Sequence, residues 1–119
     1  PIHRIYSKEN ESLYNSVAEN HLLMSHVPIY LYDYLHIKQQ RLFFPQRNEL
    51  MSAISEATII VEASDTSGSL TQARECLRQG RKLFILESCF NNPNIKWPDK
   101  FLSQGAIKVT VIKDIVNAL

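Results

Sequence analysis

Three stretches of the sequence decide its fold: Phe44-Pro45-Gln46-Arg47-Asn48, Thr58-Ile59-Ile60-Val61-Glu62-Ala63 and Ser67-Gly68-Ser69-Leu70. The first predicts the start of a helix, because proline suits a helix's first turn. The second is apolar and β-branched, which predicts a buried strand. The third predicts a loop of small residues that opens another helix. A loop between the end of a strand and a helix N-terminus offers free backbone N–H groups, and it suits an anion, phosphate most of all.

Hydrophobic periodicity predicts the remaining elements. Helices are expected over about residues 8–19, 45–55, 69–79, 99–104 and 113–119, and strands over 21–27, 57–63, 82–87 and 107–110. Ser7 and Ser69 are the expected N-caps of two helices, and Gly80 is expected to end one. The helix that contains Pro45 is expected to turn Leu50, Met51 and Ile54 inward.

Strands that alternate with helices through short turns indicate a parallel sheet covered by helices. The predicted fold class is α/β, with a parallel sheet of about four strands flanked by helices. The centre of the sheet is expected to hold Ile59, Ile60, Val61, Phe84, Ile85 and Leu86.

Composition sets limits on function. The 119 residues amount to one domain, and 45% hydrophobic with 21% charged residues is ordinary for a globular protein. The net charge of +1 argues neither for nor against a polyanionic partner. Cys76 and Cys89 form no disulfide framework, so reduced thiols and a cytoplasmic location are expected. No apolar run approaches the ~20 residues of a membrane span. The four histidines and two cysteines lack ligand spacing, so neither a metal nor a cofactor is expected.

In parallel sheets, ligands gather at the carboxyl ends of the strands. Three segments are expected to converge there: the 64–69 loop, the 88–98 loop and the segment that enters the Pro45 helix. Arg47 is a cation in a helix's first turn, where the dipole favours anions, so an anionic ligand nearby would explain it. Asn48 is expected to hydrogen-bond backbone or a base. The alternative is an exposed Arg47 without a ligand and an Asn48 that ties loop backbone together. The candidate phosphate-binding residues are Arg47, Asn48, Ser67, Gly68 and Ser69; a plain N-cap by Ser69 is the alternative for the last.

Residues 28–43 form a long connection that carries aromatic and basic side chains. Tyr30, Tyr32 and Tyr34 alternate, so an extended chain would place all three on one side. Lys38 and Arg41 follow, and aromatics mixed with cations suit single strands, whose bases stack while their phosphates pair. The alternative is an edge strand or lid that packs its tyrosines on the sheet. A second basic group, formed by Arg74, Arg78, Arg81 and Lys82, is interpreted as a solvated face.

The sequence resembles the DNA-processing protein A (DprA/Smf) family along nearly its whole length. Five segments resemble the family's motifs in the right order. The family's Ile-Tyr-Pro-x-Glu-Asn and Leu-Leu-x-Ser-Glu motifs are similar to Ile5-Tyr6-Ser7-Lys8-Glu9-Asn10 and to Leu22-Leu23-Met24-Ser25, respectively. Its Phe-Pro-x-Arg-Asn motif is similar to Phe44-Pro45-Gln46-Arg47-Asn48. Its Val-Val-Glu-Ala with Ser-Gly-Ser-Leu is similar to the segment Ile59–Leu70, and its Gly-Arg-x-Val-Phe is similar to Gly80-Arg81-Lys82-Leu83-Phe84. Gln104-Gly105-Ala106 matches the Glu-Gly-Ala before the last strand.

The resemblance implies a Rossmann-like domain that binds single-stranded DNA in a basic pocket. Family members dimerise and help load the RecA recombinase during natural transformation, a role that includes protection of single-stranded DNA and no catalysis. Single-stranded DNA, RecA and a second copy of the chain are therefore the expected partners, and no enzymatic activity is expected. Ile112, Ile115 and Val116 are the expected dimer contacts.

The sequence departs from the family pattern at several places. A Gly-Ser-Arg turn and a Ser-Gly-x-Ala-x-Gly-Ile-Asp segment are absent and would lie upstream of Pro1. Residues 1–119 are therefore expected to be a single domain that lacks its N-terminal half. Gln46 stands at an often basic position, and Glu87-Ser88-Cys89 stands where the family usually has Pro-Gly.

A nucleotide-binding sensor domain of the same Rossmann-like superfamily is the alternative. The enzyme branch of that superfamily carries Pro-Gly-Gly-x-Gly-Thr-x-x-Glu where this chain has Ser64-Asp65-Thr66-Ser67-Gly68-Ser69-Leu70-Thr71-Gln72. This difference disfavours a phosphoribohydrolase. Binding of a fluorescent oligo-dT, compared with binding of a nucleotide panel, separates the two remaining hypotheses.

Overall fold

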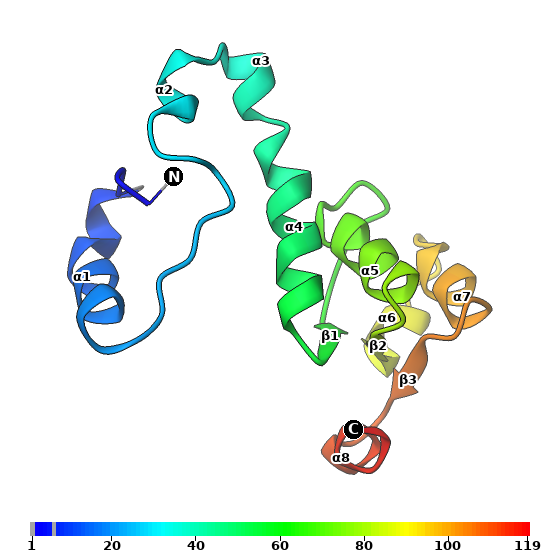
Figure 1. The fold of residues 1–119 in the computed structure, drawn as a ribbon. Coiled ribbons are helices and arrows are strands. Elements are labelled where there is room, and N and C mark those ends of the chain that lie inside the picture. Colours follow the sequence, from blue (N-terminus) through cyan, green and yellow to red (C-terminus); the bar gives the residue numbers. More distant parts are fainter. Residues whose placement is uncertain (1, 6) are drawn as a thin grey trace. The chain divides into compact units, whose positions relative to one another are not determined.

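The computed structural model describes residues 2–5 and 7–119 (Figure 1). Pro1 and Tyr6 lie outside the described residues, and Tyr6 belongs to the first of the family-like segments. The chain divides into two compact units, Pro1–Arg47 and Asn48–Leu119. The boundary falls inside one helix, α4 (Phe43–Ile54).

The first unit is helical. It contains η1 (Lys8–Asn10), α1 (Glu11–Asn20), α2 (Leu31–Tyr34), α3 (Ile37–Gln40) and the start of α4. The helix predicted over residues 8–19 is confirmed as η1 and α1. Ser7 accepts a hydrogen bond from the Asn10 N–H at 3.0 Å through its backbone oxygen, and its side chain makes no capping bond.

The strand predicted over residues 21–27 is wrong. Within the described chain this segment pairs with no strand, and a strand needs a neighbour to satisfy its N–H and C=O groups. Val27 is nevertheless buried, and its N–H donates to the Ser25 Oγ at 3.2 Å. The segment is therefore an irregular connection.

Residues 28–43 do not form the extended chain or edge strand considered from the sequence, because the segment contains α2 and α3. Local hydrogen bonds explain the difference. The Gln40 side chain donates to the carbonyl oxygens of Tyr32 at 2.9 Å and Leu35 at 3.0 Å. The Gln39 side chain accepts from the His36 N–H at 3.2 Å and closes the first turn of α3. These amide side chains satisfy backbone groups that an extended chain would leave to a neighbouring strand.

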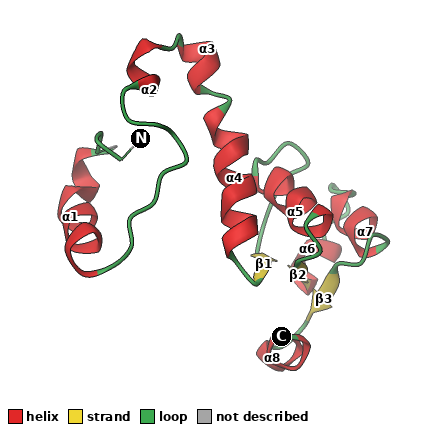
Figure 2. Ribbon diagram, viewed as in Figure 1, coloured by secondary structure: helices red, strands yellow, loops and turns green. Residues whose placement is uncertain are grey.

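The second unit is an α/β layer structure, as predicted (Figure 2). After the end of α4 it contains β1 (Ala57–Ile60), α5 (Ser69–Arg78), β2 (Lys82–Leu86), α6 (Glu87–Phe90), α7 (Trp97–Leu102), β3 (Ile107–Val109) and α8 (Ile112–Ala118). All three strands are parallel, in the order β1-β2-β3. The expected sheet of about four strands has three here, because residues 21–27 form none.

The core lies between the sheet and the helices α5 and α7. Ile60, Leu83 and Ile85 of the strands pack with buried residues of the helices and loops: Ala63, Leu70, Ala73, Cys76, Cys89, Trp97, Phe101 and Ala106. Phe84 is also fully buried, so the predicted centre is confirmed at Ile60, Phe84 and Ile85, and Leu86 is half-buried. The prediction is wrong for Ile59, which is 46% exposed, and for Val61, which is 62% exposed. β1 is one of the two edge strands of the described sheet, and Val61 follows its last residue.

Polar contacts hold the end of α4 against α5. Arg78 at the end of α5 pairs with Glu49 at 2.8 Å, and Arg81 donates to the Ala53 carbonyl oxygen at 2.8 Å. Ser52 is therefore the buried residue of α4, while Met51 and Ile54, predicted to face inward, are exposed. The same contacts show that much of the basic group around α5 is engaged within the protein; Lys82 bonds the carbonyl oxygens of Ala118 and Leu119.

None of the helices described is both long enough and apolar enough to cross a membrane. Cys76 and Cys89 are buried and free. In the described part of the chain, no three His, Cys, Asp or Glu side chains gather in a way that could hold a metal ion.

Gly80 ends α5, as predicted from the sequence. Its φ of +69° is left-handed, its N–H donates to the Leu77 oxygen at 3.0 Å, and the next N–H, of Arg81, donates to the Cys76 oxygen at 2.9 Å. This pair of bonds is the Schellman arrangement, and it turns the chain directly into β2.

We expect Gly80→Ala to lower the free energy of unfolding by ~1–2 kcal/mol, the cost of a side chain in left-handed backbone. A Cβ at this position would meet no atom within 4 Å, so the cost comes from the backbone alone. Urea denaturation measures it. Gly68→Ala is the matched control, because Gly68 has a right-handed φ of −60° and equally open surroundings. Equal destabilisation by both changes would contradict this account.

Asp114 lies in the first turn of the terminal helix α8. Its Oδ2 accepts from the N–H groups of Thr110 at 2.9 Å and Val111 at 3.0 Å, and these two bonds lower the pKa of Asp114. A carboxyl with a lowered pKa in the folded state stabilises the fold above its unfolded pKa, which is ~3.9. That stabilisation is lost as the pH falls through the lower folded value.

We therefore expect the Thr110 and Val111 amide resonances to shift together on acidification, with a midpoint below the ordinary Asp value. An NMR pH titration measures the shift, and Asp114→Asn removes the titrating group. A midpoint at or above ~3.9 would show that the two bonds do not favour the carboxylate.

Candidate functional site

The loop of residues 61–68 leaves the carboxyl end of β1 and is held in place by contacts with residues that follow β2 in the chain. The Trp97 indole N–H donates to the Ala63 carbonyl oxygen at 3.0 Å in a buried bond. The Cys89 Sγ lies 3.3 Å from the Val61 carbonyl oxygen. Asp65 accepts from the Lys96 backbone N–H at 3.4 Å. The loop's position is therefore set by α6, by α7 and by the residue that precedes α7.

The Ser67–Ser69 turn closes on itself at the start of α5. The Ser69 N–H donates to the Ser67 Oγ at 3.3 Å, and the Ser67 hydroxyl donates to the Ser69 Oγ at 3.2 Å. The Leu70 and Thr71 N–H groups donate to the Ser67 and Gly68 oxygens at 3.1 and 3.0 Å. The expectation of several free N–H groups is therefore wrong, as is a cap by Ser69, which is the first helical residue.

The turn still offers polar groups to a ligand. The Gly68 N–H has no hydrogen-bond partner among the described residues, and the Ser69 hydroxyl proton is not used in the bonds above. A Cβ at Gly68 would meet nothing within 4 Å, so the surroundings of Gly68 are open. A phosphate oxygen could therefore approach the turn at Gly68 and Ser69.

Asn48 joins α4 to this turn. Its side-chain N–H donates to the Gly68 carbonyl oxygen at 3.2 Å. Within the second unit, Asn48 therefore ties the backbone of the 64–69 loop to α4, which is the alternative to a contact with a base. Arg47 is the preceding residue of α4 and the last of the first unit. It is exposed, and its guanidinium carbon lies 5.5 Å from the centroid of the Phe44 ring.

A cavity of about 400 Å³ lies at the carboxyl ends of β1 and β2. Residues 61–64 line one side, and Ser88, Cys89, Asn92 and Ile95 line the other, so the predicted meeting of the two loops is confirmed. Burial and the nearby Glu62 raise the pKa of the Cys89 thiol, which keeps it protonated and unreactive. The lining includes the Glu62 carboxylate and no cation, which makes the cavity a poor place for a phosphate.

The tyrosines of the 28–43 connection do not form one row. Tyr30 precedes α2 with a left-handed φ of 73°, and Tyr32 and Tyr34 lie within α2, where residues two apart do not face the same way. Tyr34 is 85% exposed and Tyr30 is also exposed, while Tyr32 is half-buried with its ring centroid 6.1 Å from that of Phe43. Lys38 and Arg41 are exposed in and after α3.

Trp97 was not expected to matter, because the sequence places it in a loop between two prolines. In the structure it begins α7, is buried and holds the 61–68 loop. Its signal was the residue type itself, since a tryptophan buries a large area and its N–H usually finds a hydrogen-bond partner when it is buried.

Comparison with known proteins gives a consistent result. The sequence model of the family described as DNA recombination-mediator protein A matches residues 1–119. The DNA processing protein DprA of Bacillus subtilis is 35% identical over 115 residues, which are 97% of this chain and 37% of that protein. Protein Smf of Escherichia coli is 42% identical over 76 residues, 64% of this chain and 20% of that protein.

Solved structures of DNA processing protein A are similar as well. The Streptococcus pneumoniae structure has a TM-score of 0.71 at 24% identity and covers 98% of this chain and 39% of its own; it bears on the fold alone. The Helicobacter pylori structure, described by its single-stranded DNA binding mode, has a TM-score of 0.70 at 28% identity and covers 97% of this chain and 50% of its own. The chain thus spans between a fifth and a half of these relatives' lengths.

Proposed function

This chain belongs to the DNA recombination-mediator protein A (DprA/Smf) family, and we propose from that premise that it binds single-stranded DNA as part of a recombination mediator. The match of the family model to all 119 residues carries the proposal. The Helicobacter pylori relative, described by its single-stranded DNA binding mode, supports it. The role is one of binding and involves no catalysis.

Three exposed cations support phosphate binding: Lys38, Arg41 and Arg47. None of them makes an ion pair with a described residue, in contrast to Arg4, which pairs with Asp33, and Arg78, which pairs with Glu49 and Glu75. An unpaired cation on the surface is free to meet a phosphate and release its counterion. The Arg47 guanidinium over the Phe44 ring is also held in a preferred position before DNA arrives.

The Ser67–Ser69 turn supplies a second place for phosphate. A phosphate there would accept from the Gly68 N–H and the Ser69 hydroxyl, while Asn48 holds the Gly68 carbonyl oxygen. Such contacts fix the position of the strand and carry no base information. Base stacking is assigned to the exposed rings of Tyr30 and Tyr34 in preference to the half-buried ring of Tyr32.

Further steps of the proposal concern the biological setting. The roles that fit a recombination mediator of this family are protection of single-stranded DNA during DNA uptake and natural transformation, and help in loading the RecA recombinase. A nucleotide sensor is the less favoured alternative, because the cavity at the strands' carboxyl ends presents Glu62 and no cation to a nucleotide's phosphates.

Self-association is part of the proposal. Ile112 and Val116 lie one turn apart on α8 and are 79% and 66% exposed, while Ile115 is half-buried. Residues four apart share a helix face, so these two side chains form one apolar strip. A second copy of the chain that covers the strip would remove it from water.

We expect Arg47→Ala to weaken oligo-dT binding by about fivefold, the equivalent of ~1 kcal/mol for an exposed charge contact. The slope of log K against log salt should become shallower by about 0.7, the value for one phosphate contact to a single strand. Mixed-sequence oligonucleotides should lose affinity equally. Fluorescence anisotropy across a salt series measures all three quantities.

Arg78→Ala is the matched control for that measurement. It removes the same charge from an arginine already paired with Glu49 and Glu75, so the salt slope should stay at the wild-type value. If Arg47→Ala leaves both affinity and slope unchanged, Arg47 makes no phosphate contact. Binding of a nucleotide panel in the absence of oligo-dT binding would favour the sensor.

For self-association, we expect the double change Ile112→Glu and Val116→Glu to convert a dimer into a monomer, because four carboxylates would then face one another across the interface. Light scattering at high micromolar concentration gives the mass. Asn117→Glu adds a charge on the same helix outside the apolar strip and should leave the dimer intact. A wild-type protein that is monomeric at these concentrations refutes the interface.

A further inference from the structure

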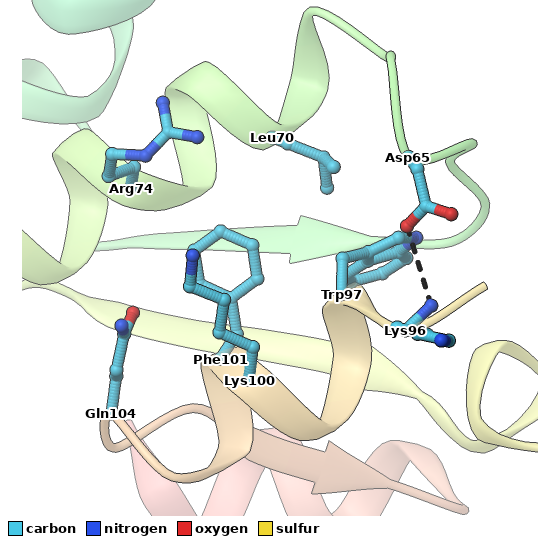
Figure 3. A pocket seen from close by; sticks show the side chains of 8 residues that line it. All are labelled: Asp65, Leu70, Arg74, Lys96, Trp97, Lys100, Phe101 and Gln104. Carbon is cyan, nitrogen blue, oxygen red and sulfur yellow. Dashed lines mark hydrogen bonds between the residues drawn. The ribbon is translucent and has the colours of Figure 1, made fainter.

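A second cavity, of about 450 Å³, lies between α5 and α7 (Figure 3). We refer to it as the α5–α7 groove. Both helices and the 61–68 loop contribute side chains to it, and it does not share a lining residue with the cavity at the strands' carboxyl ends. Its volume falls in the range of sites that hold a small organic ligand or a few residues of a peptide.

The floor of the groove is apolar. Leu70, Trp97 and Phe101 form it, and all three also belong to the core. The rings of Trp97 and Phe101 meet edge to face with centroids 6.1 Å apart, and the indole N–H is already donated to Ala63. Trp97 and Phe101 are only 5% and 4% exposed, so neither ring offers an open face to a ligand.

The rim of the groove is basic. Arg74 on α5, Lys96 before α7 and Lys100 on α7 are all exposed, and none makes an ion pair with a described residue. Arg78, one turn after Arg74, shows the contrast, since two glutamates neutralise it. In Figure 3 the rim cations come from both sides of the groove.

The polar groups that remain on the rim do not cancel this charge. Asp65 is the single carboxylate in the lining, and its Oδ1 accepts from the Lys96 backbone N–H at 3.4 Å, at the Trp97 end of the groove. Gln104 lies at the other end, near Arg74 and Lys100, and its side chain is neutral. The groove therefore carries three positive charges against one negative charge above an apolar floor.

This chemistry distinguishes among anionic ligands. A single strand of DNA could place phosphates on the cations, but its bases need open aromatic faces, and the two rings provide none. A small inorganic anion would use the rim and leave the apolar floor in water. A peptide meets both surfaces, because carboxylates pair with Arg and Lys while an apolar side chain covers the floor.

We propose that the α5–α7 groove binds an acidic segment of a partner protein in which carboxylates flank one apolar anchor residue. The carboxylates meet Arg74, Lys100 and Lys96, and the anchor lies against Leu70 and the ring edges of Trp97 and Phe101. The proposal adds a protein-binding surface to the proposed DNA-binding function and does not rest on it.

The test uses fluorescein-labelled hexapeptides with three carboxylates around a single Leu or Phe, measured by anisotropy on the whole chain. We expect dissociation constants below about 1 mM that rise with salt. Arg74→Glu and Lys100→Glu should each weaken binding by about tenfold, because each replaces attraction with repulsion. Gln104→Glu should weaken it as well, and this neutral, exposed position leaves the core unchanged.

Matched controls make the result specific. Lys113→Glu reverses an exposed charge on α8, which does not line the groove, and it should bind the peptides like the wild type. A peptide with the same carboxylates and Gly as its anchor should bind at least several-fold more weakly. Circular dichroism confirms that each variant is folded.

Oligo-dT binding by the same variants separates this proposal from the DNA-binding proposal. Wild-type affinity for oligo-dT with lost peptide binding supports a separate protein-binding groove, whether or not Arg47 contacts DNA. The proposal is overturned if no peptide binds the wild type, or if the rim variants bind peptide normally. It is also overturned if the rim variants weaken oligo-dT binding while the peptides do not bind, since the groove would then belong to the DNA surface.

Discussion

The buried hydrogen bond from the Trp97 indole N–H to the Ala63 carbonyl oxygen fixes the geometry on which the second unit's surfaces depend. A carbonyl oxygen in the core without a donor would cost ~1–3 kcal/mol, so the loop after β1 is held to the start of α7. Ala63 lines the cavity at the carboxyl ends of β1 and β2 and belongs to the loop that leads to the Ser67–Ser69 turn, and Trp97 also lines the α5–α7 groove. Together with the contacts of Cys89 and Lys96, this bond holds the loop to which all three features belong.

The two units differ in how their charges and apolar residues are used. In the second unit, most cations on α5 and just after it make contacts within the protein. Arg78 pairs with two glutamates, Arg81 donates to the Ala53 carbonyl oxygen, and Lys82 donates to carbonyl oxygens at the end of α8. Arg74 on α5 makes no ion pair with a described residue, and it lines the α5–α7 groove. In the first unit, Lys38, Arg41 and Arg47 have no acidic partners among the described residues, and two tyrosines are exposed beside them in sequence. The net charge of the chain is only +1, so the candidate binding surfaces are identified by cations without an acidic partner among the described residues.

The sequence predicted most of the second unit and little of the first. The apolar runs at residues 57–63 and 82–87 predicted β1 and β2, because a continuous apolar, β-branched run is typical of a buried strand. Gly80 predicted the end of α5, because glycine readily adopts the left-handed turn that ends a helix. Residues 21–27 have the composition of a strand, but strand formation depends on a partner that composition does not reveal. The tyrosines alternate as in a strand, and yet two glutamines close helical turns around them. Asn48 and the serine turn were found from the helix start at Pro45, from the small-residue turn after a strand and from the family resemblance. The groove was not found, because Arg74 and Lys100 lie far apart in sequence and line one cavity only in the folded chain.

Recognition of DNA and of an acidic peptide on one small chain is consistent with the different chemistry of the two surfaces. Phosphates remain largely in water when they bind, so exposed cations and an open glycine turn suffice, and affinity falls steeply with salt. A short peptide with a few carboxylates carries less negative charge than a DNA strand. It therefore needs an apolar contact in addition to its charge pairs to bind. The α5–α7 groove provides this contact at Leu70, Trp97 and Phe101. Charge alone would direct either ligand to either surface; the buried aromatic edges of the groove are what distinguish them.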